Sequence, residues 1–221
     1  IEYLSCECRK YYSYVNGTKT FEGKNKFSLG NPTDSCFDIP FNPNVEGSLQ
    51  TQIHVIAGGP CSGKTTLLKA LSAAGYRVEE ETAEQLIKAG VALGKRAEDL
   101  RAEPLQWQKH VIEQDHKLFD SLPVDTLVFT DTSMIEDLVF GDRAGLSIGP
   151  NLEAWIRYKR YKKVFFLAPL ELYEQTDVRM ESQETALEIS EEVQRRYRHY
   201  GYDPITVSSA PTEQRIQFIL S

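Results

Sequence analysis

The chain has 221 residues, of which 41% are hydrophobic and 26% charged, and its formal net charge at pH 7 is −7. This length suffices for one α/β domain with a sizeable core plus an accessory segment. The acidic balance makes nucleic acid an unexpected partner, because phosphate backbones select a basic face. No apolar run approaches the roughly 20 residues that span a bilayer, and no signal-peptide pattern opens the chain. Because the sequence does not begin with Met, we expect an upstream segment.

The four cysteines are too few for a disulfide scaffold in a chain of this length. The alternative to free thiols is a zinc site made by Cys6, Cys8 and Cys36. Zinc sites usually have a second pair of closely spaced ligands, and this sequence lacks one. We therefore expect reduced thiols and a cytoplasmic location.

Residues 1–50 differ from the rest of the chain in being rich in Tyr, Phe, Asn, Gly and Pro. The dipeptide Asn16-Gly17 is typical of a two-residue hairpin turn and lies between the strand-like stretches YYSYV and TKTFEG. We expect a turn-rich N-terminal extension, irregular or β-rich, that contains this hairpin. A protein partner could bind through this extension. The alternatives are an arm that packs on the main domain and an arm that is partly disordered.

From residue 51 to residue 221, apolar strand patterns alternate with helical patterns. The expected strands are 52–58, 76–81, 125–131, 162–169 and 203–209. The expected helices are 64–75 with Gly75 as its end, 83–94 with Thr82 as its N-cap, 104–120, 151–161, 183–200 and 212–220. This alternation predicts one domain over 51–221, a three-layer α/β fold with a central parallel sheet of five strands.

The first of these strands leads into a phosphate-binding motif. GGPCSGKT matches G-x-x-x-x-G-K-[ST] without a mismatch, between a predicted strand and a predicted helix. The glycines let successive backbone N–H groups surround a phosphate, and the helix adds its positive N-terminal end. Lys64 is expected to reach the β- and γ-phosphates, and the Thr65 hydroxyl to ligate Mg²⁺. The expected nucleotide-binding residues are Gly58, Gly59, Pro60, Cys61, Ser62, Gly63, Lys64, Thr65 and Thr66.

A second magnesium ligand is expected at the end of a nearby apolar strand. Asp131 follows the strand LVFT and is the candidate, so the predicted metal ligands are Thr65 and Asp131. The alternative role for Asp131 is the N-cap of a following helix. His54, inside the first strand, is expected to be a packed residue rather than a catalyst. Cys61 is expected to be only a small residue that fits the loop, the alternative being a thiol made oxidisable by the helix terminus.

The order of these stretches over about residues 52–220 resembles one P-loop family. That family includes the nicotinamide riboside kinase domain of NadR and the nucleotide-binding, AAA-type domain of the TRP-channel translocation protein. The similar segments include GGPCSGKTTLLKALSAAGYRVEEETAEQLI, PLQWQKHVIEQ, LVFTDTSMIEDLVFG and EQRIQFIL. The resemblance covers about three quarters of the chain and does not reach residues 1–50.

The resemblance implies a kinase-like P-loop topology in which the strand that carries Asp131 lies beside the P-loop strand. It implies a catalytic carboxylate near the end of the second strand, best matched by Glu81, with Glu79 and Glu80 as neighbours. Such a carboxylate accepts the proton of an acceptor hydroxyl. The alternative is a solvated strand end followed by a helix with a favourable acidic first turn.

Two further regions acquire expected roles from the resemblance. Arg179, in the segment QTDVRMESQE, matches a lid arginine over the phosphates, with Arg195 and Arg196 as alternatives. Ser208, after the last strand, lies where a loop passes beside the nucleotide base.

The chain departs from the family at two positions on the acceptor side. The family commonly has Arg after the acidic residue of the third strand and again three residues after the carboxylate of the second strand. This chain has Thr132 and Glu84 there. Loss of one preorganised cationic donor typically costs on the order of 3 kcal/mol in the transition state. A nicotinamide riboside acceptor is therefore not expected.

The leading interpretation is an ATP- or GTP-dependent phosphotransferase that acts on a small hydroxylated acceptor, or an NTPase. Lys64, Asp131 and Arg179 would handle the phosphates, and Glu81 would be the base. The chain has no Asn-Lys-x-Asp guanine signature, which favours ATP. The alternatives are a nucleotide-dependent module that binds a protein or lipid partner, and a nucleotide-binding remnant within a larger protein.

Overall fold

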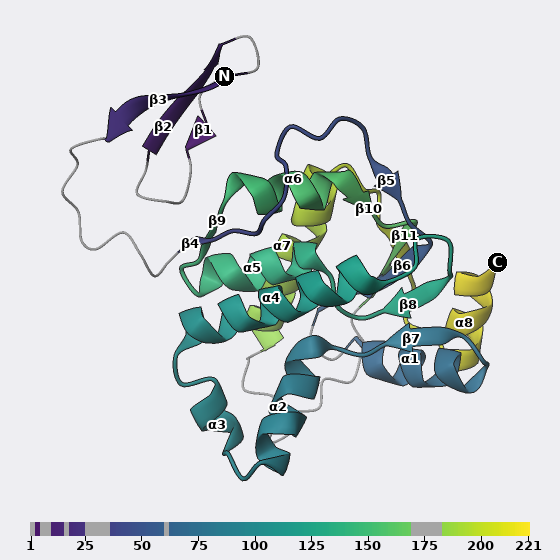
Figure 1. Cartoon of the computed structure of the whole chain (residues 1–221). Coiled ribbons are helices and arrows are strands. Elements are labelled where there is room, and N and C mark those ends of the chain that lie inside the picture. Colours follow the sequence, from purple (N-terminus) through teal and green to yellow (C-terminus); the bar gives the residue numbers. More distant parts are fainter. Residues whose placement is uncertain (1–2, 5–9, 16–17, 25–35, 60–61, 169–182) are drawn as a thin grey trace.

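A parallel sheet of five strands forms the centre of the molecule. The computed structural model describes residues 3–4, 10–15, 18–24, 36–59, 62–168 and 183–221 (Figure 1). The strands are β6 (Ile53–Ala57), β7 (Arg77–Glu79), β8 (Val128–Thr130), β11 (Lys163–Leu167) and β12 (Ile205–Val207). Their order across the sheet is β12-β11-β6-β8-β7, and every neighbouring pair is parallel. This confirms the predicted five-stranded sheet and the position of β8 beside β6.

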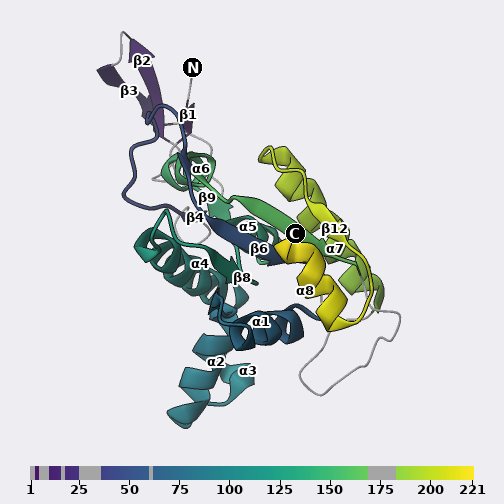
Figure 2. The ribbon, with the colours of Figure 1, turned by 90° about the vertical axis from the view of Figure 1, so that its right-hand side faces the viewer.

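Helices cover both faces of this sheet and complete the three layers (Figures 1 and 2). One face carries α1 (Lys64–Ala73) and α8 (Thr212–Leu220), and the other carries α4 (Pro104–Ser121), α5 (Met134–Arg143), α6 (Pro150–Tyr158) and α7 (Gln183–His199). The remaining helices, α2 (Thr82–Ala92) and α3 (Ala97–Leu100), follow β7 and project from the body of the molecule. In the described part of the chain, no helix combines the length and apolarity that crossing a lipid bilayer requires.

The alternation of side chains along β6 divides the core into two parts. Val55 and Ala57 belong to the larger core with α4 to α7, whereas Ile56 belongs to the smaller core with α1 and α8. Successive strand residues point to opposite faces, so a strand with helices on both sides must be apolar throughout. His54 lies between the rings of Phe129 and Phe165, with centroids 5.4 and 5.9 Å away, as expected for a packed residue.

Residues 36–50, the last part of the predicted N-terminal extension, pack on the main domain. β4 (Cys36–Phe37) pairs with β9 (Ser147–Ile148), and β5 (Leu49–Gln50) pairs with β10 (Lys159–Arg160). The carboxylate of Asp38 accepts the backbone N–H of Leu152 at 2.8 Å and so caps α6 from a distant part of the chain. For these residues the alternative of an arm that packs on the domain is the one observed, and the boundary at residue 50 stays a prediction.

The first part of the chain contributes a separate small sheet. β1 (Tyr3–Leu4), β2 (Lys10–Val15) and β3 (Thr18–Lys24) are antiparallel in the order β1-β2-β3. Val15 pairs with Thr18, which agrees with the predicted hairpin, although the turn at 16–17 lies outside the described residues.

The prediction of reduced thiols is wrong for Cys36, which is disulfide-bonded. The other three cysteines lie outside the residues whose side chains are described. The expected cytoplasmic location therefore loses the support it drew from reduced thiols.

The ends of the helices confirm one sequence prediction and correct two others. Gly75, with φ 90°, directly follows the C-cap Ala74 of α1, as predicted. The N-cap of α2 is Glu81 rather than Thr82, which is the first helical residue and whose hydroxyl bonds elsewhere. The N-cap of α5 is Ser133, so the alternative role of Asp131 as a cap is wrong.

A buried pair of carboxyl groups joins α2, α4, α5 and the segment after β8. The Asp115 carboxylate accepts hydrogen bonds from the Thr82 hydroxyl and, at 2.8 Å, from the Thr132 hydroxyl. Burial raises the pKa of both carboxyl groups, that of Asp137 well above its usual value. The nearby Asp115 raises the pKa of Asp137 further, whereas hydrogen bonds from Asp137, Thr82 and Thr132 oppose the rise at Asp115. Asp137 therefore holds a proton and donates it to the Asp115 carboxylate. Thr132, where the family commonly has Arg, is one of the donors that hold this pair.

We expect Thr132→Val to lower the free energy of unfolding by about 1–3 kcal/mol, because it leaves a buried carboxylate without one of its donors. Val has nearly the shape of Thr, so packing is preserved. Chemical denaturation at pH 7 measures the change. Thr126→Val, at an exposed position, is the matched control, and equal stabilities of the two variants would contradict the assigned role.

Candidate functional site

The phosphate-binding motif connects β6 to α1 at the carboxyl end of the central strand. Lys64 is the first residue of α1, and its ammonium group donates to the carbonyl oxygens of Gly58 at 2.9 Å and Gly59 at 3.4 Å. The backbone N–H groups at the start of α1 have no partner within the helix, which makes this end suited to an anion. Pro60 and Cys61, the centre of the motif, lie outside the described residues.

Two of the motif glycines are required by local geometry. Gly63 is the N-cap of α1 and has φ 87°, a left-handed conformation that residues with a Cβ rarely adopt. A Cβ at Gly58 would lie 2.7 Å from the Ser62 hydroxyl oxygen and 3.1 Å from the Leu167 carbonyl oxygen. The motif therefore keeps glycine where the chain turns and where it approaches its neighbours closely.

Asp131 is a buried carboxyl group beside this loop. It follows β8, the neighbour of β6, and is only 5% exposed, while its Oδ1 atom has no hydrogen-bond partner. Its pKa is raised to about 7, mainly by burial and further by Glu81, against the lowering effect of the Lys64 ammonium. The parallel register of the sheet thus brings together a lysine and an aspartate that are far apart in the sequence.

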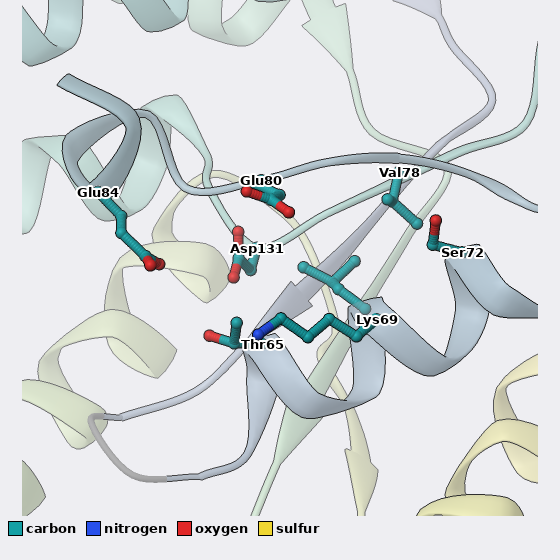
Figure 3. A pocket seen from close by; sticks show the side chains of 8 residues that line it. Thr65, Lys69, Ser72, Val78, Glu80, Glu84 and Asp131 are labelled. Atoms are coloured by element: carbon teal, nitrogen blue, oxygen red, sulfur yellow. The ribbon is translucent and has the colours of Figure 1, made fainter. Parts of the chain in front are cut away.

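A small cavity of about 130 Å³ lies next to Thr65 and Asp131 (Figure 3). It is lined by Thr65, Leu68, Lys69, Ser72, Val78, Glu80, Glu84 and Asp131. In Figure 3 the side chains of Glu80, Glu84 and Asp131 gather above the Thr65 hydroxyl. The two predicted metal ligands therefore share one cavity, and its walls are mainly acidic on the side of β7 and α2.

Of the three glutamates at the end of β7 and directly after it, Glu81 has the environment of a functional carboxylate. Burial raises its pKa, with Glu84 and Asp115 acting in the same direction and the Lys64 ammonium opposing them. Glu79 instead pairs with Arg77 at 2.9 Å, and Glu80 is exposed at the cavity wall. The structure thus places Glu81 in the electrostatic neighbourhood of Lys64 and Asp131.

Glu136 is a member of this group that the sequence analysis did not identify. It is 7% exposed, and its backbone N–H donates to the Ser133 hydroxyl at 3.1 Å. Burial raises the pKa of its carboxyl group to about 8, against the lowering effects of Lys64 and of the Gly58 backbone N–H that donates to it. The available signal was the capping-box pattern Ser133-x-x-Glu136 after a buried strand.

The other residues to which the sequence analysis gave a role are mostly at the surface or outside the described residues. Thr66 is exposed on α1, and Ser208 is exposed after β12. Glu84 pairs with Lys88 at 2.8 Å on the surface of α2. Arg179 lies outside the described residues. Of its two alternatives, Arg195 is exposed and Arg196 pairs with Asp142.

We expect Glu136→Gln to stabilise the protein more at pH 8–9 than at pH 5. The carboxyl pKa rises from its ordinary 4.5 to about 8 on folding. Its stabilising contribution is therefore complete below the unfolded-state pKa and is lost as the pH rises through 8. The lost contribution is at most roughly 5 kcal/mol. Thermal unfolding of both proteins between pH 5 and pH 9 measures the effect. Parallel pH curves, or the same change in the exposed control Glu191→Gln, would refute it.

Comparisons with known proteins identify the fold and the family of this chain. Among solved structures, NadR protein in complex with NR has a TM-score of 0.53 and 20% sequence identity over 72% of this chain. The match covers 45% of that chain, so the present chain spans less than half of its length. This likeness shows a shared fold.

Two weaker structural likenesses are deoxyadenosine kinase from M. mycoides and shikimate kinase from Aquifex aeolicus vf5. The former has 15% identity and a TM-score of 0.49, with 76% of this chain and 96% of that chain covered. The latter has 17% identity and a TM-score of 0.44, with 76% of this chain and 93% of that chain covered.

No curated protein matches the chain. A family model described as AAA domain matches residues 53–215, which is well over half of the sequence. The chain therefore belongs to the AAA domain family.

Proposed function

We propose that the chain binds a nucleoside triphosphate, ATP or GTP, through residues 58–66 and transfers its terminal phosphoryl group to a hydroxyl group of a small acceptor. One observation carries this proposal. The Lys64 ammonium, the buried Asp131 carboxyl group and Glu81 influence one another electrostatically beside the loop motif. A cation next to two carboxyl groups of raised pKa, at the end of a parallel sheet, is typical of a catalytic site.

The phosphate end of the site depends on the loop and Lys64. In the structure, the ammonium group of Lys64 donates to the loop carbonyls of Gly58 and Gly59. A bound triphosphate would take over these donors, since charged phosphate oxygens are stronger acceptors than carbonyl oxygens. The donors already lie at the loop, so little reorganisation accompanies the development of charge during transfer.

The oxygen atoms beside the loop suit a magnesium ion. Thr65 and Asp131 line the same cavity, and the Oδ1 atom of Asp131 has no partner. No group of three or more His, Cys, Asp or Glu side chains among the described residues is arranged to hold a metal. This fits Mg²⁺, which commonly uses one or two protein oxygens plus phosphate and water oxygens. Held by Thr65 and Asp131, Mg²⁺ would supply positive charge that offsets the negative charge of the phosphates.

The acceptor end of the site would use Glu81. Its carboxylate accepts the proton of the acceptor hydroxyl while that oxygen bonds to the γ-phosphorus and the bond from phosphorus to the bridging β–γ oxygen breaks. The raised pKa of Glu81 brings it closer to neutral pH, which suits a general base. Glu80, at the cavity wall, is the alternative base.

The identity of the acceptor does not follow from the structural likeness to NadR protein. That likeness rests on 20% identity and supports the fold alone. Thr132 and Glu84, where the family commonly has arginines, bond to Asp115 and Lys88 and supply no cation to the acceptor side. We therefore propose an acceptor other than the NR of that complex.

The same two positions favour a second candidate function. A site that keeps its phosphate loop without acceptor-side arginines can serve as a nucleotide-dependent binding module with little catalysis. Nucleotide binding would then control the attachment of a protein partner, for which residues 1–50 are the proposed surface.

We expect Lys64→Ala to lower nucleotide affinity at least tenfold, because it removes the charge-assisted hydrogen bonds to phosphate. Isothermal titration calorimetry with ATP and with GTP, each with Mg²⁺, measures the affinity and identifies the preferred base. Unchanged affinity would exclude the loop as the binding site.

We expect Glu81→Gln to lower phosphoryl transfer by about 10²–10⁴-fold while nucleotide affinity persists, because it removes the general base. A screen of small alcohols and sugars with γ-labelled nucleotide measures transfer. Glu46→Gln, at an exposed position, is the matched control. If the unsubstituted protein binds nucleotide but transfers to no acceptor and to water only at background rate, the binding module is the better description.

A further inference from the structure

Arg215 in α8 is a buried arginine that contacts the phosphate loop. Its side chain is 5% exposed, and its Nη1 atom donates to the carbonyl oxygen of Ser62 at 3.1 Å. Ser62 is the residue directly before Gly63 and Lys64 in the motif. The two residues are 153 positions apart in the sequence and meet because α8 packs beside α1 on the same face of the sheet (Figure 2).

Among the described residues, no carboxylate pairs with this guanidinium group, whereas buried cations normally have such a partner. Within the described part of the chain, Arg215 forms no ion pair, and its Nε atom has no hydrogen-bond partner. A buried charge without a carboxylate partner is costly, and an apolar side chain of similar volume is often equally or more stabilising at such a position. Packing alone therefore does not account for an arginine here.

The contact with Ser62 constrains the peptide unit that leads into Gly63. The peptide bond between Ser62 and Gly63 is trans, so the Ser62 carbonyl and the Gly63 N–H point in opposite directions. By holding the carbonyl toward α8, Arg215 directs the N–H of Gly63 away from α8. The same arginine adds a positive charge behind the loop, which favours an anion on its other side.

We propose that Arg215 is a positioning residue of the nucleotide site. It fixes the Ser62–Gly63 peptide so that the Gly63 N–H faces the nucleotide phosphates, and its charge strengthens phosphate binding. This inference rests on the proposed nucleotide-binding function. It makes α8 a part of the phosphate site, although α8 lies almost 150 residues after the motif in the sequence.

The test compares Arg215→Met with the unsubstituted protein, using two ligands that share phosphates and differ in the base. Calorimetry with ATP, or with GTP if the protein prefers it, and with inorganic pyrophosphate is expected to show both affinities reduced about tenfold to a hundredfold. The two factors should agree, because the effect acts through the phosphates. The denaturation midpoint of the unliganded protein is expected to stay the same or rise, because an unpaired buried charge is removed.

Three outcomes would overturn the proposal. The first is that both affinities stay unchanged. The second is that affinity falls for the nucleotide but not for pyrophosphate, which would indicate a contact with the base. The third is that the affinities fall and the unliganded protein is destabilised to the same extent, which would indicate a structural role. Arg101→Met, at an exposed position, controls for net charge.

Arg215→Lys keeps the charge without the fork of donors and provides the measurement if the Met variant does not fold. Its affinities are expected to fall between those of the unsubstituted protein and Arg215→Met, and full retention of affinity would contradict the positioning role. Nucleotide binding by the unsubstituted protein and its loss in Lys64→Ala establish that the site itself works. If the unsubstituted protein binds no nucleotide, the proposed function fails. If the unsubstituted protein binds nucleotide and the Arg215 variants bind it equally well, only the inference about Arg215 fails.

Discussion

Burial of carboxyl groups around the Lys64 ammonium is the constraint on which the site depends. Asp131, Glu136 and Glu81 all have a raised pKa because burial disfavours their charged forms, and Lys64 opposes that effect in each case. One cation does not balance three carboxylates in a medium of low dielectric constant, so Asp131 and Glu136, with pKa values of about 7 and 8, keep protons near neutral pH. Positive charge that arrives with a metal ion would release those protons, which couples ligand binding to the ionisation of the site.

The fold creates this concentration of charge at the carboxyl end of its sheet. Parallel strands bring their carboxyl ends to one edge, so residues after β6 and β8 meet although 67 positions separate Lys64 from Asp131. The N-terminus of α1 lies at the same edge and offers unpaired N–H groups. Packing on the two faces is divided between a larger and a smaller core, and α8 in the smaller core reaches the loop through Arg215.

On the side expected to bind the acceptor, hydrogen bonds between buried carboxyl groups and hydroxyl groups stand where a cation was expected. Where the family commonly has an arginine, this chain has Thr132, whose hydroxyl bonds to Asp115 in a proton-sharing pair with Asp137. The pair joins α2, which begins after Glu81, to α4 and α5. It therefore holds the segment that carries the candidate base without adding a cation. Under the proposed function, such a site would keep its phosphate end and take a different acceptor at the other end.

The sequence by itself determined the elements and the phosphate motif, since both depend on residues that are near neighbours in the chain. Alternating apolar strands and amphipathic helices predict the five-stranded sheet, and the spacing of Gly58, Gly63 and Lys64 predicts the loop. Local patterns also misplaced the start of α2, where Thr82 bonds to Asp115 instead of capping the helix. Only the tertiary structure brought Glu136, Asp115 and Arg215 to the site, because burial, shared protons and a carbonyl contact across 153 positions depend on packing between elements. Glu136 does lie in a local capping-box pattern, but that pattern indicates a helix start and not the burial of its carboxyl group near Lys64.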